Sequence, residues 1–373
     1  MRLAIVRQKY NPAGGAERFV SRALTALSAT GSVEVSLIAR RWETLEGIRA
    51  LKADPFYLGN VWRDWGFALA ARRLWERAGF DLVQSHERIP GCHVYRAGDG
   101  VHRHWLALRR RTLTAAGRWA LALNPYHAYV QWAERRMFLH PNLKRVICNS
   151  RMVQTELEQY FGLPAHKSVV IYNGVDTVRF HPSLRALHRQ AQRQALRVPE
   201  EAALLVYVGS GFERKGVARA LQALVAAPQA WLVVVGHDKH AGRYQGLAES
   251  LGVAGRVRFA GAQKDVRPFY GMADAFILPT LYDPFPNVCV EALACGLPVF
   301  TTVQCGAAEL IRDDENGWIC DALDVTKLGT QVARWSQSRA DWPRLAEAAR
   351  ATAEPLTLEA MAEALLDCYR TLL

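Results

Sequence analysis

Two segments of the sequence combine residue types that could bind and activate an anionic substrate. In the first, GSGFERKG at residues 209–216, glycines such as Gly209 permit close backbone approach, and Arg214 and Lys215 provide adjacent cations. This combination suits a diphosphate, because its negative charge must be neutralised when it departs as a leaving group. The alternative is an ordinary basic first turn of a helix, which the helix dipole disfavours.

The second segment, DPFPNVCVEALACGLPV at residues 283–299, carries two carboxylates eight positions apart, Asp283 and Glu291. Pro284 and Pro286 exclude a continuous helix between them. The spacing therefore predicts Asp283 on a loop at a strand end and Glu291 on the first turns of a helix. Both carboxylates can then address one cleft. The alternative for Glu291 is a solvated carboxylate, although its neighbours in the sequence are apolar.

Weaker candidates lie near the expected ends of other strands. Gly14 and Gly15 follow the first strand pattern, and their N–H groups can bind an anion or form a plain turn. Asp99, between two glycines, can be catalytic or can cap a turn. His86 ends a strand, where a lone histidine is more often structural than catalytic. Glu309 can simply be the first acid of a helix. Neither GxGxxG nor a Walker lysine is present, so dinucleotide and P-loop sites are excluded.

Short β-branched runs alternate with helical patterns along the whole chain, which predicts an α/β fold. Several runs are apolar throughout, as is typical of parallel strands covered on both faces. The expected strands are residues 2–6, 33–38, 82–85, 145–148 and 169–172, then 204–208, 232–235, 257–259, 275–278 and 298–301. This alternation, found twice, predicts two doubly wound domains.

The boundary between the domains is expected at the turn-rich NGVDTVRFHP, residues 173–182. A first Rossmann-like domain then covers residues 1–172 and a second covers residues 173–354. The C-terminal helix, about 355–373, is expected to pack back on the first domain. Ligands of doubly wound sheets bind beyond the carboxyl ends of the strands, so the default active site is a cleft between the two domains.

Length and composition exclude several classes of protein. The 373 residues, half of them apolar and 22% charged, are typical of globular domains and not of disordered or fibrous chains. No apolar run approaches the roughly 18 residues of a membrane-spanning helix, and no secretory signal is recognisable. The seven cysteines include no CxxC pair, which argues for reduced thiols and against structural zinc. We therefore expect a cytosolic protein.

The net charge of +12 is distributed unevenly. Residues 1–170 hold 26 Lys and Arg against 13 Asp and Glu, whereas residues 171–373 hold 21 against 22. A one-sided excess indicates a surface that binds something anionic. The candidates are a phosphorylated acceptor, an anionic membrane surface and nucleic acid.

The densest basic segment, residues 101–140, holds seven arginines and one glutamate among tryptophans and tyrosines. Such helices suit the headgroup level of a bilayer, where rings bury their apolar bodies and guanidinium groups meet lipid phosphates. The alternative is an ordinary basic helical hairpin with core aromatics. The residues expected to contact the membrane or an anionic acceptor are Arg103, Trp105, Arg109, Arg110, Arg111 and Trp119.

The order of these motifs resembles a known family. GGAER near the start, CNS and YNGVD at mid-chain, VGSGFERKG, VVVG, ADAFILPT, and an acid-x7-Glu pair before ALACGLPV are similar to those of the retaining GT-B glycosyltransferases of family 4. The match runs over nearly the full length. KYNPAGG, VYRAGD and the basic aromatic hairpin most resemble the lipopolysaccharide core enzymes of the heptosyl glucosyltransferase type.

The resemblance implies a role for each motif. Glu291 would bind the ribose of the nucleotide donor, and Asp283 would contact hydroxyls of the donor sugar. Arg214 and Lys215 would contact the diphosphate, and Asp99 takes the place of an aspartate that assists acceptor activation. The implied catalytic residues are Asp99, Arg214, Lys215 and Asp283. The implied donor-binding residues are Gly14, Gly15, Gly209, Arg214, Lys215, Asp283, Asn287, Val288 and Glu291.

The sequence also departs from the family. The first carboxylate is usually Glu, and Pro286 replaces the usual glycine, which removes one backbone N–H. These changes bear on the donor sugar more than on the reaction. Family enzymes of this kind lack the DxD metal motif, which is also absent here, so we expect no metal cofactor.

The resemblance leads us to expect a retaining hexosyltransferase that uses a nucleotide-sugar, with UDP the expected nucleotide, and a phosphorylated, lipid-linked acceptor at the inner face of the cell membrane. The alternatives are a GT-B epimerase or hydrolase that acts on the nucleotide-sugar itself, and a basic nucleic-acid-binding protein. Against the latter, no RNP, helix-turn-helix or zinc-finger spacing is present.

Overall fold

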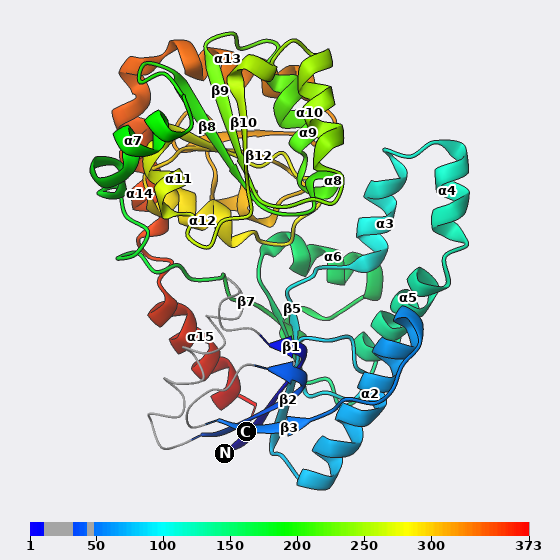
Figure 1. The fold of residues 1–373 in the computed structure, drawn as a ribbon. Helices are drawn as coiled ribbons and strands as arrows, with labels where there is room; N and C mark the ends of the chain where they lie inside the picture. Colours follow the sequence, from blue (N-terminus) through cyan, green and yellow to red (C-terminus); the bar gives the residue numbers. More distant parts are fainter. Residues whose placement is uncertain (11–32, 43–47, 373) are drawn as a thin grey trace. The chain divides into compact units, whose positions relative to one another are not determined.

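The computed structural model describes residues 1–10, 33–42 and 48–372 (Figure 1). The chain divides into two units, Met1–Asn173 with Leu358–Leu373, and Gly174–Thr357. The first division falls one residue after the boundary expected from the sequence, and the second falls three residues after it. Asn173 stays with unit 1, where its side-chain oxygen accepts a 2.7 Å hydrogen bond from Arg96.

Unit 1 is built on a seven-stranded parallel sheet of order β3-β2-β1-β4-β5-β6-β7. Ile5 of β1 pairs with Leu37 of β2 on one side and with Gln84 of β4 on the other. The strands are β1 (Arg2–Tyr10), β2 (Glu34–Trp42), β3 (Arg49–Lys52), β4 (Leu82–Ser85), β5 (Val94–Ala97), β6 (Arg145–Cys148) and β7 (Ser168–Val170).

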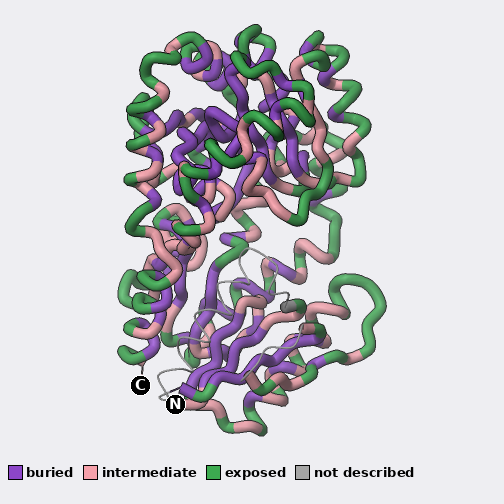
Figure 2. The backbone as a smooth tube through the Cα atoms, turned by 60° about the vertical axis from the view of Figure 1, so that its left-hand side comes forward, coloured by how far each residue is buried: buried purple, intermediate pink, exposed green. Residues whose placement is uncertain are grey.

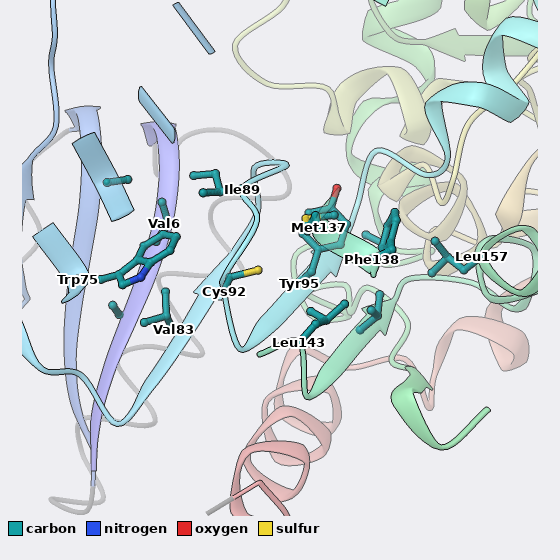
Figure 3. Close-up of a cluster of buried hydrophobic side chains, with 14 of the residues drawn as sticks. Val6, Trp75, Val83, Ile89, Cys92, Tyr95, Met137, Phe138, Leu143 and Leu157 are labelled. Atoms are coloured by element: carbon teal, nitrogen blue, oxygen red, sulfur yellow. The ribbon is translucent and has the colours of Figure 1, made fainter. Parts of the chain in front are cut away.

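Helices cover both faces of this sheet. On one face α15 (Leu358–Arg370) buries Met361, Leu365 and Tyr369 against β1 and β2. On the other, side chains of α2 (Gly59–Ala78), α5 (Pro125–Phe138) and α6 (Arg151–Phe161) form a second core; Figure 3 shows Trp75 of α2 beside Val6 and Val83. The other helical elements in the described part of unit 1 are α3 (His102–Arg110), α4 (Ala115–Ala122) and η1 (Ala165–Lys167).

Unit 2 is built on a six-stranded parallel sheet of order β10-β9-β8-β11-β12-β13. The strands are β8 (Ala203–Val208), β9 (Ala230–Val235), β10 (Val257–Gly261), β11 (Ala275–Ile277), β12 (Val299–Thr302) and β13 (Gly317–Cys320). The helices are α7 (Leu184–Ala195), α8 (Phe212–Lys215), α9 (Val217–Ala223), α10 (Ala241–Ser250), α11 (Arg267–Met272), α12 (Asn287–Ala294), α13 (Val325–Gln337) and α14 (Trp342–Ala353), with 3-10 turns η2 (Ala254–Arg256), η3 (Gly306–Leu310) and η4 (Arg339–Asp341). In each unit the buried residues concentrate in the strands (Figure 2).

A buried ion-pair cluster fastens α7 to the sheet of unit 2. Arg185, Arg189 and Arg193 all contact the Asp274 carboxylate, at 3.1, 2.7 and 2.7 Å, and the carboxylate also accepts a hydrogen bond from the backbone N–H of Leu204. Burial opposes ionisation of Asp274, but the arginines and this N–H keep the pKa of the carboxyl below its ordinary value. The three arginines therefore hold a charged carboxylate inside the unit.

Two doubly wound α/β units confirm the predicted fold class. In each sheet the strand order reverses at one point, between β1 and β4 in unit 1 and between β8 and β11 in unit 2. The carboxyl ends of the strands beside such a reversal leave a crevice where ligands of doubly wound sheets bind. The topology therefore marks one candidate site in each unit.

Candidate active site

In unit 2 the two chemically suggestive segments of the sequence meet at the reversal of strand order. Residues 209–216 follow β8, and residues 278–286 follow its neighbour β11 and lead into α12. The backbone of Leu281 donates a 2.8 Å hydrogen bond to the carbonyl of Arg214, which joins the two loops directly. Segments about 70 residues apart in the sequence thus form one site.

The basic pair converges on the first carboxylate. One oxygen of Asp283, Oδ2, lies 3.3 Å from Nη1 of Arg214 and 3.6 Å from Nζ of Lys215. Arg214 also donates a 2.7 Å hydrogen bond to the carbonyl of Tyr282. The Asp283 backbone is itself held, because its N–H donates to the Gln304 carbonyl and its carbonyl accepts from Gly306. Two cations and one carboxylate are therefore presented together on fixed backbone.

Glycines permit this close packing. A Cβ on Gly209 would lie 2.8 Å from Cδ of Lys215, so the lysine stem lies directly against this glycine. Gly216 has a φ of +85°, and a Cβ there would lie 2.0 Å from the Pro279 carbonyl oxygen. The turn after β8 can therefore press against the loop after β11, which brings Lys215 to Asp283.

The second carboxylate, Glu291, stands on α12 and is oriented by a buried tyrosine. The hydroxyl of Tyr270 on α11 lies 2.9 Å from Oε2 of Glu291 and 3.4 Å from the carbonyl of Val288. Burial, with the nearby Glu291 charge, raises the pKa of Tyr270 well above its ordinary value, so its hydroxyl keeps its proton. Asn287 and Val288 form the start of α12, as the two prolines predicted.

Unit 1 has a polar cavity of about 430 Å³ at its own reversal of strand order. The lining comes from the ends of β1 and β2, α2 and the residues just before it, the loops after β4 and β5, and α5. Its cations outnumber its carboxylates two to one, which favours an anionic ligand. The cations are Arg7, Lys9, Arg40, Arg41, Arg63 and Arg88, and the carboxylates are Asp64, Glu87 and Asp99.

Asp64 is the centre of a hydrogen-bond network in this cavity. It accepts from Arg63 at 2.7 Å, from the Gln8 side chain at 2.9 Å and from the Tyr126 hydroxyl at 3.0 Å. Burial opposes the charge of Asp64, but these donors hold the pKa of the carboxyl below its ordinary value. Burial and the same carboxylate raise the pKa of Tyr126 to about 12. The network positions Arg63 and Tyr126 on the cavity wall.

Asp99 also lines this cavity and is exposed. It follows β5, and Oδ2 lies 3.6 Å from Nη1 of Arg88. Arg88 is anchored from behind by a 2.8 Å hydrogen bond to Glu134, which is 1% exposed. Burial raises the pKa of the neighbouring Glu87. Asp99 is thus placed beside one fixed cation, Arg88.

The remaining candidates lie elsewhere. Gly14 and Gly15 lie outside the described residues. Burial and nearby arginines lower the pKa of His86 well below its ordinary value, and its ring contacts Gln84 at 3.1 Å. This environment keeps the imidazole neutral at neutral pH. Glu309 is exposed in η3.

The basic segment 101–140 folds as three helices, α3, α4 and α5, rather than as a two-helix hairpin. Arg103 lies over the Tyr160 ring and Arg109 over the Trp105 ring. Trp119 on α4 is 71% exposed, and Arg110 and Arg111 are also exposed. The described residues include no helix that is long and apolar enough to cross a membrane.

Sequence reasoning missed Tyr270 and most of the unit 1 cavity. Arg40, the adjacent Arg63 and Asp64, and Tyr126 come from three distant segments with no motif spacing, and the only signal was the surplus of arginine in residues 1–170. Within the described ranges, no three His, Cys, Asp or Glu side chains come together as a metal-binding group. All seven cysteines, each within those ranges, are buried and unpaired.

Comparison with known proteins finds a glycosyltransferase family model for each unit. Residues 13–179 match the model described as Glycosyltransferase Family 4, and residues 188–352 match the model described as Glycosyl transferases group 1. The chain is a glycosyltransferase, and each of its two units matches one of these two models. Its fold is that of the GT-B enzymes.

Individual relatives agree with this assignment. The glycosyltransferase is 26% identical to lipopolysaccharide glucosyltransferase WaaG of Escherichia coli over 326 residues, which covers 86% of this chain and 85% of WaaG. It is 34% identical to the lipopolysaccharide core biosynthesis glycosyltransferase LpsE of Rhizobium meliloti over 181 residues, about half of each chain.

Solved structures extend the likeness to the whole fold. The crystal structure of WaaG superposes with a TM-score of 0.83 at 25% identity, covering 98% of this chain and 99% of WaaG. Anabaena HepE in complex with UDP-glucose superposes with a TM-score of 0.74 at 19% identity, over the whole of both chains. The HepE likeness shows the fold alone.

Proposed function

We propose that this glycosyltransferase transfers a hexose from a UDP-sugar to an anionic saccharide of the lipopolysaccharide core or a similar lipid-linked acceptor, with retention of configuration. The observation that carries the proposal is the convergence of Arg214 and Lys215 on Asp283 at the strand-order reversal of unit 2. The similarity to WaaG and LpsE, which are named as lipopolysaccharide glycosyltransferases, supports the acceptor class, and the UDP-glucose complex of HepE supports the donor class.

In the proposal the donor binds to unit 2. Arg214 and Lys215 have more N–H groups than Asp283 alone can accept, and these meet the diphosphate oxygens. Glu291 accepts hydrogen bonds from the ribose hydroxyls, and Asp283 accepts them from hydroxyls of the sugar. Gly209, Asn287 and Val288 bring backbone close to the donor. Metal independence belongs to the proposal, because the basic pair can neutralise the charge that a metal would otherwise balance.

The chemical step is a substitution at the anomeric carbon. The acceptor oxygen forms a bond to that carbon on the face from which UDP departs, while the bond to the β-phosphate oxygen breaks with its electron pair. The anomeric carbon passes through an oxocarbenium-like state during this exchange. The acceptor proton passes either to the departing phosphate oxygen or to Asp99, and the first route requires no strong protein base. Arg214 and Lys215 stabilise the charge that develops on the diphosphate.

The acceptor in the proposal binds to unit 1. The cavity with six cations against three carboxylates suits a saccharide that carries phosphate or carboxylate groups. Arg63 and Arg88 are held by Asp64 and Glu134, so they can bind an anion without first losing much freedom of movement. Asp99 lies in the same cavity, in reach of an acceptor hydroxyl bound there.

Peripheral association with the inner face of the cell membrane completes the proposal. A lipid-linked acceptor resides at that surface, and the basic helices α3 and α4 can bind its anionic headgroups. The residues proposed for this contact are Arg103, Trp105, Arg109, Arg110, Arg111 and Trp119. Nucleic acid has no part in the proposal.

The test is acceptor-dependent release of UDP from a panel of nucleotide-sugars, with purified lipopolysaccharide core saccharide as acceptor. Lys215→Ala should lower kcat by about 100-fold or more, because such charge-stabilising donors typically contribute that much. Arg312→Ala, which removes an exposed cation from the same unit, should leave the rate unchanged. UDP release without an acceptor would instead indicate hydrolysis or epimerisation. A Lys215→Ala rate within threefold of wild type would contradict the proposed role.

A further inference from the structure

We propose that unit 1 inserts the α2–α5 face into the headgroup layer of an anionic lipid bilayer. This face comprises seven apolar side chains on α2, α5 and the residues beside them: Phe56, Leu58, Trp62, Trp65, Leu69, Trp132 and Leu139. It is separate from the α3 and α4 residues assigned above. The inference rests on the membrane-bound acceptor of the proposed function and names the surface that reaches it.

The exposure of these side chains is the first observation. Trp62, Trp65 and Trp132 are 45%, 48% and 50% exposed, and Phe56 and Leu58 are more than 75% exposed. Aqueous exposure of several large aromatic side chains is unfavourable, and a soluble domain normally buries them. An amphipathic aromatic ring is instead well placed at the boundary between lipid headgroups and acyl chains.

The spacing of these residues makes them one surface. Leu58, Trp62, Trp65 and Leu69 recur at intervals of four, three and four, so they form one stripe along α2. The rings of Phe56 and Trp62 pack edge to face at 5.6 Å between centroids.

A groove of about 600 Å³ joins this stripe to α5. Trp65 and Leu69 line it from α2, and Trp132 and Leu139 line it from the other side. Figure 1 shows α2 and α5 adjacent within unit 1, and they are in contact. The apolar surface therefore continues from one helix to the other.

The same feature is not found in the described part of unit 2. Its large exposed apolar side chains are all aliphatic, for example Val178 and Leu187, and they come from separate elements. Its tryptophans are buried or half-buried. The exposed aromatic surface is thus a property of unit 1 alone, the unit that also carries the positive charge.

The charges around the face identify its partner. The segments 56–78 and 125–141 hold six arginines and three acids. Each acid is already engaged within unit 1: Asp64 in the cationic cavity, Glu134 with Arg88, and Glu76 with Arg72 at 2.7 Å.

The arginines beside the groove point to an anionic surface. Arg135 and Arg136 line the groove and are exposed, and Arg136 lies over the Trp132 ring at 5.7 Å. Aromatic side chains fringed by arginine match an anionic headgroup layer, where the rings insert and the guanidinium groups meet lipid phosphates.

Charge also argues against a second copy of this chain. Symmetric self-association would bring the same arginines together from both copies, with the nearby acids already paired. Like charges facing each other in an interface are unfavourable. Phospholipid headgroups supply the opposite charge that a second copy lacks.

The location of the face fits the proposed reaction. Ile89, Tyr129 and Ala133 line both the apolar groove and the cationic cavity, so the two features share a wall. If the lipid part of the acceptor lies in the bilayer beside the groove, its anionic saccharide would lie on the side of the cationic cavity. Insertion of the α2–α5 face would therefore deliver the acceptor to the site.

The test measures partition of the full chain onto vesicles of phosphatidylglycerol and phosphatidylethanolamine. The double variant Trp62→Ser/Trp65→Ser should reduce the partition coefficient about tenfold or more, because two rings no longer enter the bilayer. Tryptophan fluorescence of wild type should be quenched by brominated lipids, and the variant should show less quenching. Leu187→Ser removes an exposed apolar side chain from unit 2 and should change neither readout.

Two outcomes would overturn the proposal. The first is that the double variant partitions onto vesicles as well as wild type does. This outcome would be clearest if Trp119→Ser on α4 reduces partition, because membrane binding would then depend on α4. The second is a dimeric molar mass for wild type that becomes monomeric in the double variant by light scattering, which would make the face an interface between copies.

Activity separates this proposal from the proposed function. With a detergent-dispersed acceptor, the double variant should release UDP at the wild-type rate, because neither tryptophan lines the cationic cavity. If wild type itself releases no UDP, the proposed function fails, and the vesicle measurements still decide the role of the α2–α5 face.

Discussion

Asp283 holds two cations through a single oxygen, and this sharing has a chemical consequence. Its Oδ2 lies within 3.6 Å of both Arg214 and Lys215, so the pair is fixed in place before any donor arrives. Preorganised cations stabilise developing charge without the cost of reorienting during the reaction. A single carboxylate cannot satisfy all the N–H donors of an arginine and a lysine, which leaves capacity for a diphosphate.

Tyr270 is a positioning residue for Glu291. Tyr270→Phe keeps the buried ring and removes the hydroxyl that lies 2.9 Å from the carboxylate. We expect UDP to bind about three- to tenfold more weakly by calorimetry, since one hydrogen bond to a charged group is lost. The change in kcat at saturating donor should be small, because Tyr270 acts only through Glu291.

Tyr207→Phe provides the matched control. Tyr207 is also buried in unit 2, on β8, and within the described residues its hydroxyl has no hydrogen-bond partner. Its removal should leave UDP affinity unchanged. Equal UDP affinity for wild type and Tyr270→Phe would show that Glu291 needs no orientation by this hydroxyl.

Individual residues were predictable where a motif carried them. The prolines at 284 and 286 correctly predicted that α12 begins after them and that Glu291 lies on it. Tyr270 was not predictable, because its role depends on α11 packing against α12 and no local pattern reports that contact. The roles of Arg214, Lys215, Asp283 and Asp99 stay predictions, although the structure brings the first three together.

At the scale of elements, the turn between β8 and α9 sets the geometry of the site. It works only because Gly216 has a positive φ and no side chain facing the Pro279 carbonyl. Gly216→Ala should therefore destabilise the protein by about 2–4 kcal/mol in urea denaturation, because the added methyl group meets backbone that cannot move aside.

At Gly246 we expect the same substitution, glycine to alanine, to have the opposite effect on stability. It lies inside α10 with nothing within 4 Å of its added Cβ. Gly246→Ala should stabilise the protein by about 0.5–1 kcal/mol, since alanine reduces the entropy of the unfolded chain. Similar effects of the two substitutions would refute the steric explanation for Gly216.

The strands missed by sequence reasoning share a physical reason. β3 is a short edge strand of sequence RALK, which no apolar run marks. β5 is fully buried but includes Arg96, whose charge obscures the pattern although its guanidinium is satisfied in part by Asn173. β13 begins with glycine and is four residues long. The long apolar runs, such as β8, were found because both of their faces are covered.

At the scale of the whole molecule, charge follows the division into units. The surplus of 13 positive charges in residues 1–170 supplies both the cationic cavity and the arginines of the α2–α5 face. Unit 2 contains all the donor-site candidates that the structure describes and is close to neutral. The sequence predicted the imbalance, but the assignment of the charges to two separate surfaces required the fold.

The end of the chain completes the core of unit 1, and this can be tested by Leu365→Ala. Leu365 of α15 is 2% exposed and packs with β1 and β2, while the nearby Tyr369 hydroxyl donates a 2.6 Å hydrogen bond to Gln84 of β4.

Removing the buried leucine should destabilise unit 1 by about 2–5 kcal/mol. Hydrogen exchange should accelerate in β1 and β2 peptides and stay unchanged in β8, because the core cluster that contains Leu365 is made of unit 1 residues only. Glu363→Ala, on the exposed side of α15, should leave exchange in all three strands as in wild type. If Leu365→Ala instead accelerates hydrogen exchange in β8 and leaves β1 protected, the last helix would be shown to stabilise unit 2 rather than unit 1.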